Sequence, residues 1–257
     1  MFDVTTEAVD EVGPLSNGEF TQGTMVHVLP RAPLVDRIDH LVAMAKGRRV
    51  IHVGFVDTGC RTMNQSADAW LHAHLNAVTD SLVGIDVDEV GVKEASAAGY
   101  ESYVADCRDP EALEALGIEP ADIVIAGEII EHLDDPGAFL AGLHALVKPG
   151  GRLVVTTPNA YGLFNVLASL ALREINHPDH VMMFTWRTLT NLASRHGWTP
   201  VSTHVYVPSV KDLSGQRAGA RLLGLAARVA VALERGLAKV GRGYAADGLI
   251  IVFRTAP

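Results

Sequence analysis

Two carboxylates and an imidazole stand close together in the middle of the chain. Glu128, Glu131 and His132 occupy positions i, i+3 and i+4, directly after the apolar run 121–127. In a helix these side chains would project from one face. Such a set can bind Mg²⁺ or another divalent cation such as Mn²⁺, which lowers the pKa of a bound hydroxyl. The spacing therefore predicts a metal site. In the competing interpretation Glu128 caps the helix or touches a cofactor, and the other two residues hydrogen-bond the scaffold.

A pair of histidines forms the second group of candidate residues. His177 and His180 lie in the segment 177–184, after the fifth predicted strand, and loops at strand ends often carry chemistry. The ordinary pKa of histidine suits proton removal near neutrality. We expect His180 to be the general base or an additional metal ligand. Alternatively, the backbone satisfies both imidazoles. The expected catalytic residues are His132, His180 and Glu131, and the expected substrate contacts are Tyr161, His177 and Gln22.

The turn after the first predicted strand departs from a dinucleotide fingerprint. The segment 54–59 reads GFVDTG, so Val56 stands where a second glycine would let the backbone approach a pyrophosphate. This disfavours NAD and FAD and favours a cofactor without a pyrophosphate.

Acidic residues end the next two predicted strands. Asp86 can accept hydrogen bonds from both hydroxyls of a ribose, and Asp106 can meet an adenine amino group. Asp88 is expected to cap the following helix instead. The residues expected to bind the cofactor are Gly54, Phe55, Asp57, Thr58, Asp86, Val87, Asp106, Cys107 and Gly127.

The elements that position these residues alternate along the chain. Short Val- and Ile-rich runs between helical patterns predict a doubly wound α/β fold with a mainly parallel sheet. The strands are expected at 49–54, 81–86, 101–106, 121–127, 152–158, 200–207 and 248–254, the last of which can enter the sheet antiparallel. The helices are expected at 34–45, 66–78 with Ser66 as N-cap, 88–100, 111–117, 136–151, 185–196 and 212–241. The apolar tract 159–172 is either a helix over the substrate or a packing helix.

The combination of these motifs resembles class I S-adenosylmethionine-dependent methyltransferases. The resemblance rests on Gly54, Asp86, Asp106, the segment GEIIEHL (127–133) and the segment LVKPGGRLVVTTPN (146–159). It covers roughly residues 35–207 and the final strand. It implies a Rossmann-like sheet of seven strands, S-adenosylmethionine as cofactor, and methyl transfer.

Two groups within that superfamily share further motifs with the chain. The E-x-x-E-H arrangement is similar to O-methyltransferases of ubiquinone biosynthesis. The segments 70–72 (WLH), 99–100 (GY) and 177–184 (HPDHVMMF) resemble a group associated with polysaccharide and glycan biosynthesis, and cover more of the chain. This second resemblance implies a sugar hydroxyl of an oligosaccharide or polysaccharide precursor as acceptor. A phenolic or quinone-like small molecule is the alternative, and a catalytically silent binding protein is a third.

The chain departs from the family pattern in its first strand and first loop. His52 stands in place of the usual acidic residue, and Val56 and Thr58 replace the next two glycines. Gly54 and Asp86 are 86 − 54 = 32 residues apart, about ten more than the compact pattern. The methionine end of the cofactor is therefore expected to be held differently, with help from Asp57 or Thr58.

Length and composition limit the other possibilities. The 257 residues carry 21 basic and 30 acidic side chains, a net charge of −9, which disfavours nucleic acid as a partner. Two cysteines without CxxC spacing and the absence of a signal-peptide pattern or a long apolar run favour a cytoplasmic protein without a transmembrane segment. We expect residues 1–32 to form an arm or lid and 33–257 to form the methyltransferase domain, with a helical insertion at about 211–243.

A basic stripe marks the predicted helix of that insertion. Its arginines recur every seven residues, and the roughly opposite face is apolar. We expect the apolar face to pack on the domain, while peripheral contact with an anionic membrane and a homodimer in place of a monomer are alternatives. The stripe consists of Arg221, Arg228, Arg235 and Arg242, and the apolar face of Leu222, Ala226, Val229, Leu233 and Leu237.

Overall fold

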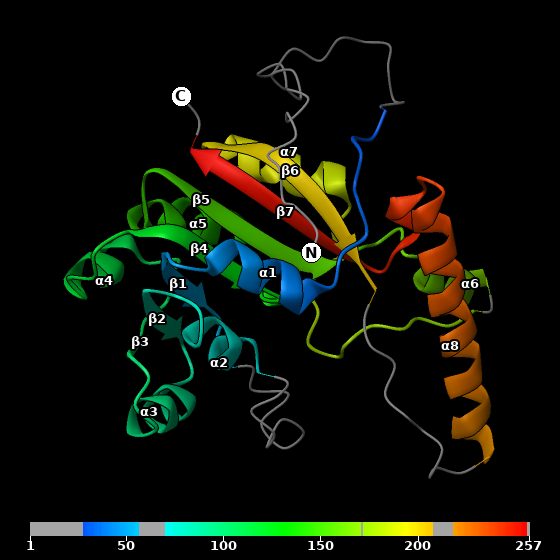
Figure 1. The fold of residues 1–257 in the computed structure, drawn as a ribbon, viewed down its shortest axis with the longest axis horizontal. Helices are drawn as coiled ribbons and strands as arrows, with labels where there is room; N and C mark the ends of the chain where they lie inside the picture. Colours follow the sequence, from blue (N-terminus) through cyan, green and yellow to red (C-terminus); the bar gives the residue numbers. More distant parts are fainter. Residues whose placement is uncertain (1–27, 57–69, 171, 208–217, 256–257) are drawn as a thin grey trace.

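A computed structural model describes residues 28–56, 70–170, 172–207 and 218–255. Seven strands form one sheet in the order β3-β2-β1-β4-β5-β7-β6 (Figure 1). The strands from β1 to β5 pair in parallel, and β7 pairs antiparallel with both β5 and β6. The expected doubly wound α/β sheet and its antiparallel final strand are thus confirmed. The strands are β1 (Arg49–Val53), β2 (Ser81–Asp86), β3 (Ser102–Val104), β4 (Ala121–Gly127), β5 (Val147–Pro158), β6 (Trp198–Tyr206) and β7 (Gly248–Thr255).

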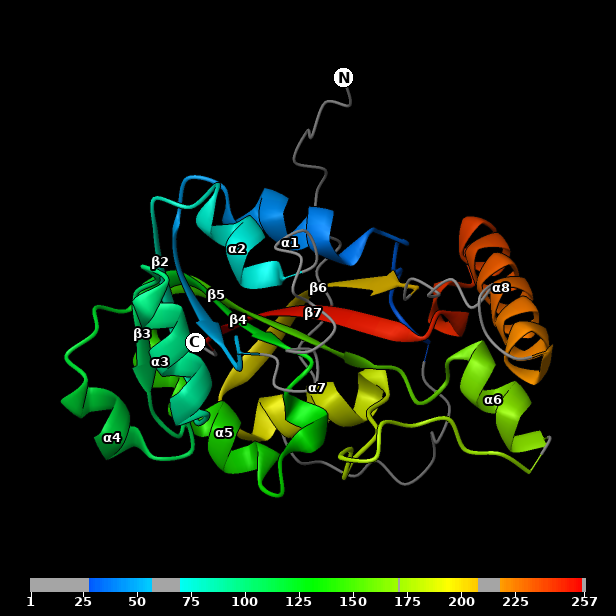
Figure 2. The same cartoon turned by 90° about the horizontal axis from the view of Figure 1, so that it is seen from below.

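Helices cover both faces of this sheet (Figure 2). On one face α1 (Arg37–Ala45) and α2 (Leu71–Asn76) bury Leu41, Leu71 and Leu75 against the strands. On the other face lie α4 (Pro110–Ala115), α5 (Pro136–Gly142) and α7 (Trp186–Arg195), whose apolar side chains fill the larger core cluster. The helix α3 (Glu89–Ala97) contacts β2 and β3, and its N-cap is Asp88, as expected. Because both faces are covered, the strands of the centre are mainly apolar.

Two helices extend beyond one end of the sheet. The helices α6 (Leu163–Leu170) and α8 (Ala218–Lys239) lie side by side there (Figures 1 and 2). The expected inward packing of the apolar face is wrong at Val229 and Leu233, which are exposed, whereas Ala230 and Glu234 are buried. Leu237 is partly buried, and the side chains of Leu222 and Ala226 lie outside the described part of the chain. The physical reason is that α8 packs through the narrow face that meets α6, one residue along from the expected one.

Two helix boundaries differ from the sequence prediction. The helix expected at 136–151 ends at Gly142; a 3₁₀ turn, η4 (Leu143–Leu146), follows, and Val147 begins β5. Pro149 lacks an N–H and Gly150 has a φ of +79°, so neither suits a helix interior. The helix expected from residue 66 begins at Leu71 with Trp70 as N-cap, and Ser66 lies outside the described residues.

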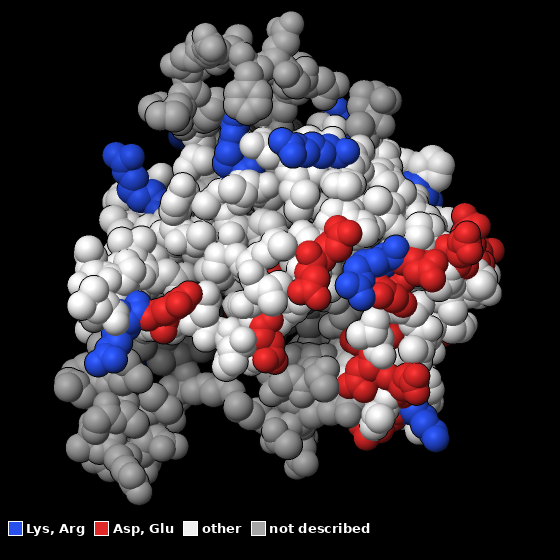
Figure 3. Space-filling view, turned by 180° about the vertical axis from the view of Figure 1, so that it is seen from behind, with Lys and Arg blue, Asp and Glu red and all other residues white. Residues whose placement is uncertain are grey.

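Acidic side chains gather at the end of the molecule that carries β3, α3 and α4 (Figure 3). They include the exposed residues Glu89, Glu94, Glu101, Asp109, Glu111 and Glu114. Within the described ranges no helix has the length and apolar character needed to cross a membrane.

Candidate active site

The first turn and the end of β2 are locked together at the carboxyl edge of the sheet. The two carboxylate oxygens of Asp86 accept hydrogen bonds from the backbone N–H groups of Val56 (2.9 Å) and Asp88 (3.0 Å). Gly54 has a φ of +70°, and a Cβ there would lie 2.5 Å from Cδ1 of Ile129. Only glycine therefore suits this position, which brings the turn close to the loop after β4.

Two aromatic side chains, those of Phe55 and Trp70, stabilise this turn. Phe55 is buried, and a Cβ on Gly84 would lie 2.7 Å from its ring. The indole Nε1 of Trp70 donates a hydrogen bond of 2.8 Å to the carbonyl of Phe55. The sequence analysis named Trp70 in the WLH motif but did not predict this contact, which joins residues 15 positions apart in sequence.

His52, which stands where the family pattern has an acidic residue, forms a buried pair with a second histidine. Nδ1 of His52 lies 3.2 Å from Nδ1 of His72, and both residues are buried. Burial lowers the pKa of His52 well below its ordinary value and that of His72 to about 3. Both imidazoles are therefore neutral near pH 7, and the sequence analysis did not foresee their pairing.

Glu128 sits at the end of β4 in a network that spans the sheet. Thr156 and Tyr206 each donate a hydroxyl hydrogen bond of 2.7 Å to Oε1 of Glu128. Arg37 donates from Nε to the Thr156 hydroxyl at 3.2 Å and lies 3.9 Å from the carboxylate. Burial, and then the carboxylate of Glu128, raise the pKa of Tyr206 well above its ordinary value, so its hydroxyl stays a donor.

Glu131 faces the protein interior. It is fully buried, and Thr157 donates a hydrogen bond of 2.9 Å to its Oε2. Burial, followed by the charge of Glu128, raises the pKa of Glu131 to about 8, so this side chain is mostly a neutral acid at pH 7. The Glu131 side chain therefore hydrogen-bonds within the protein, as the alternative to a metal ligand predicted.

The single helical face expected for Glu128, Glu131 and His132 does not form. Glu128 has a left-handed backbone (φ 54°), and the helix after it is one 3₁₀ turn, η3 (Ile130–His132). Among the described residues, the group that could hold a metal ion is His132, His177 and His180. The structure therefore does not gather the ligand set that the spacing predicted, because its residues leave a strand rather than share a helix.

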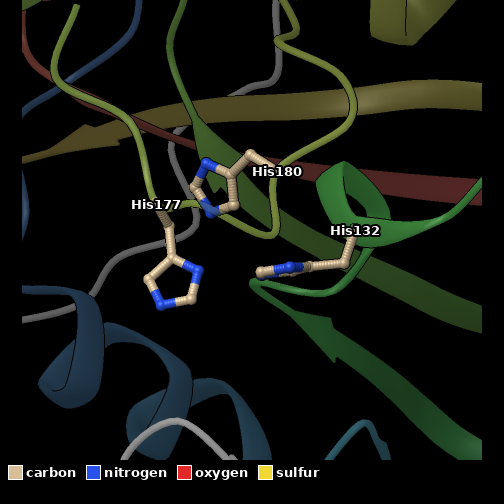
Figure 4. A group of neighbouring side chains, drawn as sticks. All are labelled: His132, His177 and His180. Carbon is tan, nitrogen blue, oxygen red and sulfur yellow. The ribbon is translucent and has the colours of Figure 1, made fainter.

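The three histidines point toward one another from two separate segments (Figure 4). His132 comes from η3, whereas His177 and His180 come from the loop before α7. Their candidate ligand atoms all lie within 4.8 Å of one another. Burial, followed by the neighbouring imidazoles, lowers the pKa of His180. The structure thus brings together the two histidine-bearing motifs of the sequence.

The other expected cofactor residues surround the strand ends. Both carboxylate oxygens of Asp106 accept hydrogen bonds from Arg108, which lowers the pKa of Asp106. Val87 is 64% exposed, whereas the Cys107 thiol is buried in the core, which raises its pKa to about 12. Gly127 leaves room for Arg37, since a Cβ would lie 3.0 Å from its Nη2.

Two of the expected substrate contacts lie on the surface near this edge. Tyr161 is 61% exposed just after β5, and His177 is exposed as well. Gln22, Asp57 and Thr58 lie outside the described residues.

An open pocket adjoins the histidine-bearing loop. It has a volume of about 480 Å³, and most of its lining residues belong to the segment 172–183 or to α6. Its polar lining consists of Asn165, Ser169, Arg173, Glu174 and Asn176. The segment 172–183 therefore carries two of the three histidines and much of the pocket wall.

Comparisons with known proteins identify the family of the domain. A family model described as a methyltransferase domain matches residues 34–203. A ubiquinone biosynthesis O-methyltransferase of Caulobacter vibrioides is 36% identical over 127 residues, 48% of this chain and 42% of that protein. The corresponding protein of Rhodopseudomonas palustris is 40% identical over 104 residues, 38% of this chain and 41% of that protein. The matches thus span about two fifths of the length of these relatives.

A solved structure shares the fold. The crystal structure of a SAM-dependent methyltransferase from Archaeoglobus fulgidus superposes with a TM-score of 0.51 at 16% identity, over 84% of this chain and 90% of that one. The first turn, which only glycine permits, and the Asp86 carboxylate at the end of β2 fit a nucleoside cofactor. The chain belongs to the methyltransferase domain family, and it shares its fold with a SAM-dependent methyltransferase.

Proposed function

We propose that this methyltransferase methylates a hydroxyl oxygen, and that the acceptor is a sugar of an oligosaccharide or polysaccharide precursor. The observation that carries the proposal is the loop 172–183, which carries two imidazoles and lines a pocket with several polar side chains in its wall. Sugar hydroxyls need many hydrogen-bonding partners, and side chains such as Asn165, Arg173 and Asn176 supply them. The resemblance of the segment 177–184 to glycan-associated methyltransferases supports the same acceptor class.

The cofactor residues act through the first turn. Asp86 would accept hydrogen bonds from the ribose hydroxyls. The backbone N–H groups of Val56 and Asp88 donate to its carboxylate and hold it in place. The cofactor supplies an electrophilic methyl group when it is bound. We assign the cofactor contacts to Gly54, Phe55, Asp57, Thr58, Asp86, Val87, Asp106, Cys107 and Gly127.

A histidine would remove the acceptor proton. The lowered pKa of His180 keeps its imidazole neutral near pH 7, and a neutral imidazole can accept a proton. His132 is the second candidate for this role. His177 and Tyr161, both exposed, would contact the acceptor.

Magnesium assistance at Glu128, Glu131 and His132 does not fit the observed side chains. Mg²⁺ prefers anionic oxygen ligands and keeps several waters, whereas Glu131 is fully buried, bonded to Thr157 and mostly protonated. We therefore derive no step through that ion. Activity after chelation, with and without added Mg²⁺ or Mn²⁺, tests this directly, and a magnesium-specific rescue would restore the original prediction.

A phenolic or quinone-like acceptor is the second candidate. The observation that favours it is the printed name of the curated relatives, ubiquinone biosynthesis O-methyltransferase. A phenol is also more acidic than an alcohol, so a neutral histidine would remove its proton more easily.

The deciding experiment measures transfer of a labelled methyl group to panels of oligosaccharides and phenols. We expect incorporation into sugars, and a fall of about 10²–10⁴-fold in His180→Ala, the usual loss on removing a general base. His74→Ala, on α2, is the matched control and should keep its rate. Label in phenols alone would replace the acceptor class. Cofactor binding without transfer to either panel would favour the silent binding protein.

A further inference from the structure

We propose that His132, His177 and His180 form a binding site for a transition-metal ion such as Zn²⁺. The ring centroids of His132 and His180 are 4.6 Å apart, and those of His177 lie 5.8 Å from His132 and 5.5 Å from His180. Three imidazoles thus surround one small space (Figure 4). This set shares His132 with the carboxylate site that the sequence spacing predicted, and His180 with the additional ligand expected there, but it contains no carboxylate.

Backbone contacts hold the two segments of the site together. The carbonyl of Glu131 accepts hydrogen bonds from the N–H groups of Val181 (3.0 Å) and Met182 (3.1 Å). The residue before His132 therefore anchors the residues directly after His180. The meeting of the three rings follows from this docking and not from chance contact between surface side chains.

Asp179 provides a second-shell partner for the ring of His132 and also contacts the ring of His177. Nδ1 of His132 lies 3.2 Å from the Asp179 carbonyl, an arrangement that fixes the ring and leaves Nε2 free to bind a metal. The Asp179 N–H donates to Nδ1 of His177 at 3.3 Å, so this nitrogen is an acceptor in that contact, and the Asp179 carboxylate lies 3.8 Å from it. Backbone carbonyls and carboxylates are the usual partners of metal-binding histidines.

His180 completes the set without a competing partner. Its Nδ1 is buried and has no hydrogen bond to the described part of the protein. A buried polar atom without a hydrogen-bond partner costs free energy. Binding a metal through the His180 ring would offset this cost. Among the described residues, no hydrogen-bonding group competes with a metal for this nitrogen.

The donor set determines the class of metal. Imidazole nitrogens suit Zn²⁺, Fe²⁺, Ni²⁺ and Cu²⁺, whereas Mg²⁺ and Ca²⁺ prefer oxygen. Nitrogens of a tetrahedral zinc site lie about 3.3 Å apart, so donors within 4.8 Å reach that geometry through side-chain rotation. Three histidines leave a fourth position open, as in catalytic zinc sites. The further statement that this position takes an acceptor oxygen rests on the proposed function, and with zinc bound the metal, in place of a free His180 imidazole, would lower the pKa of that oxygen.

The test is metal binding to the full chain after treatment with a chelator. Titration with Zn²⁺ should show one ion per chain, and Co²⁺ should give the visible absorption of a tetrahedral nitrogen site. The variants His132→Ala, His177→Ala and His180→Ala should each weaken Zn²⁺ binding by more than about 10-fold, because even second-shell losses cost that much. His74→Ala should bind as the native chain does, and Mg²⁺ should not compete. Thermal unfolding of each variant verifies that it is folded.

Two results would overturn the site: no Zn²⁺ binding by the native chain, or equal affinity in the folded histidine variants. The readout is separate from catalysis. Zinc binding without methyl transfer would leave the site standing and reject the proposed function. Methyl transfer that is unaffected by chelation, in a chain that binds no zinc, would support the proposed function and reject the zinc site.

Discussion

Asp86 is the single residue on which the cofactor assignment depends most. Removing its carboxylate takes away the expected ribose contacts and frees the N–H groups of Val56 and Asp88. We expect Asp86→Ala to weaken S-adenosylmethionine binding by about 1.5–3 kcal/mol, the value of charge-assisted hydrogen bonds. Calorimetry measures this directly. Glu114→Ala, which removes an exposed carboxylate on α4, should have no effect, and an unchanged affinity of folded Asp86→Ala would refute the assignment.

At the scale of elements, the turn after β1 depends on Gly54 for two separable reasons. Its φ is +70°, and a Cβ would also collide with Ile129. Gly117 has a similar φ of +62° with nothing within 4 Å, so Gly117→Ala measures the backbone strain alone, about 1–2 kcal/mol. Gly54→Ala should lose more stability than this and should also bind S-adenosylmethionine more weakly. Equal unfolding free energies for the two variants would show that the turn tolerates the side chain.

The contact between α8 and the rest of the chain contains a buried carboxyl pair. Glu234 is fully buried, and its Oε1 accepts a hydrogen bond from the N–H of Phe164 on α6. Burial, followed by the carboxylate of Asp247, raises the pKa of Glu234 to about 8. Glu234 therefore joins two helices and the start of β7 in its protonated form.

This pair makes stability depend on pH in a definite direction. A carboxyl whose pKa is raised from 4.5 to about 8 contributes stability below pH 4.5, and this is lost as the pH rises through 8. Glu234→Gln keeps the hydrogen-bonding shape without the charge. We expect it to stabilise the fold by about 1–3 kcal/mol at pH 8.5 and by less at pH 5.5, measured by thermal unfolding. Glu114→Gln should show no such pH dependence, and a Glu234→Gln gain independent of pH would contradict the assigned titration.

At the scale of the whole molecule, the domain begins where the chain joins the sheet. Two backbone hydrogen bonds of 2.9 Å join the segment before α1 to β6. The N–H of Val35 donates to the carbonyl of Val205, and the N–H of Val205 donates to the carbonyl of Pro33. We propose that residues 1–32 form an arm over the acceptor and that the methyltransferase domain occupies 33–257, with its helical insertion at about 211–243.

Deleting residues 1–28 tests the arm. The deletion spares the pairing of Pro33 and Val35 with β6, so the melting temperature should change little. Turnover should fall by about 10-fold or more, because a lid orders the reacting groups. Full activity of the shortened chain would reject the arm as a lid, and a large fall in melting temperature would show that it supports the fold instead.

Local patterns in the sequence determined much of this protein. Apolar runs and helical periodicity depend on neighbouring residues, so they predicted the order of strands and helices and the Asp88 cap. The positions of Gly54 and Asp86 at strand ends also followed from those runs. The same local patterns gave a wrong prediction near Pro149: they extended a helix to residue 151, where the structure has the first part of β5, which pairs with β4.

Only the tertiary structure decided how the polar residues meet. The partners of Glu128 are Thr156 and Tyr206, which are 28 and 78 residues away in sequence, and no periodicity links them. Sequence spacing grouped Glu131 with His132, but burial turned the carboxyl inward to Thr157. The imidazole instead meets two histidines about 45 residues further along, because the Glu131 carbonyl anchors their loop. Contacts between segments so far apart depend on how the sheet brings its strand ends together, which the sequence encodes only through the whole fold.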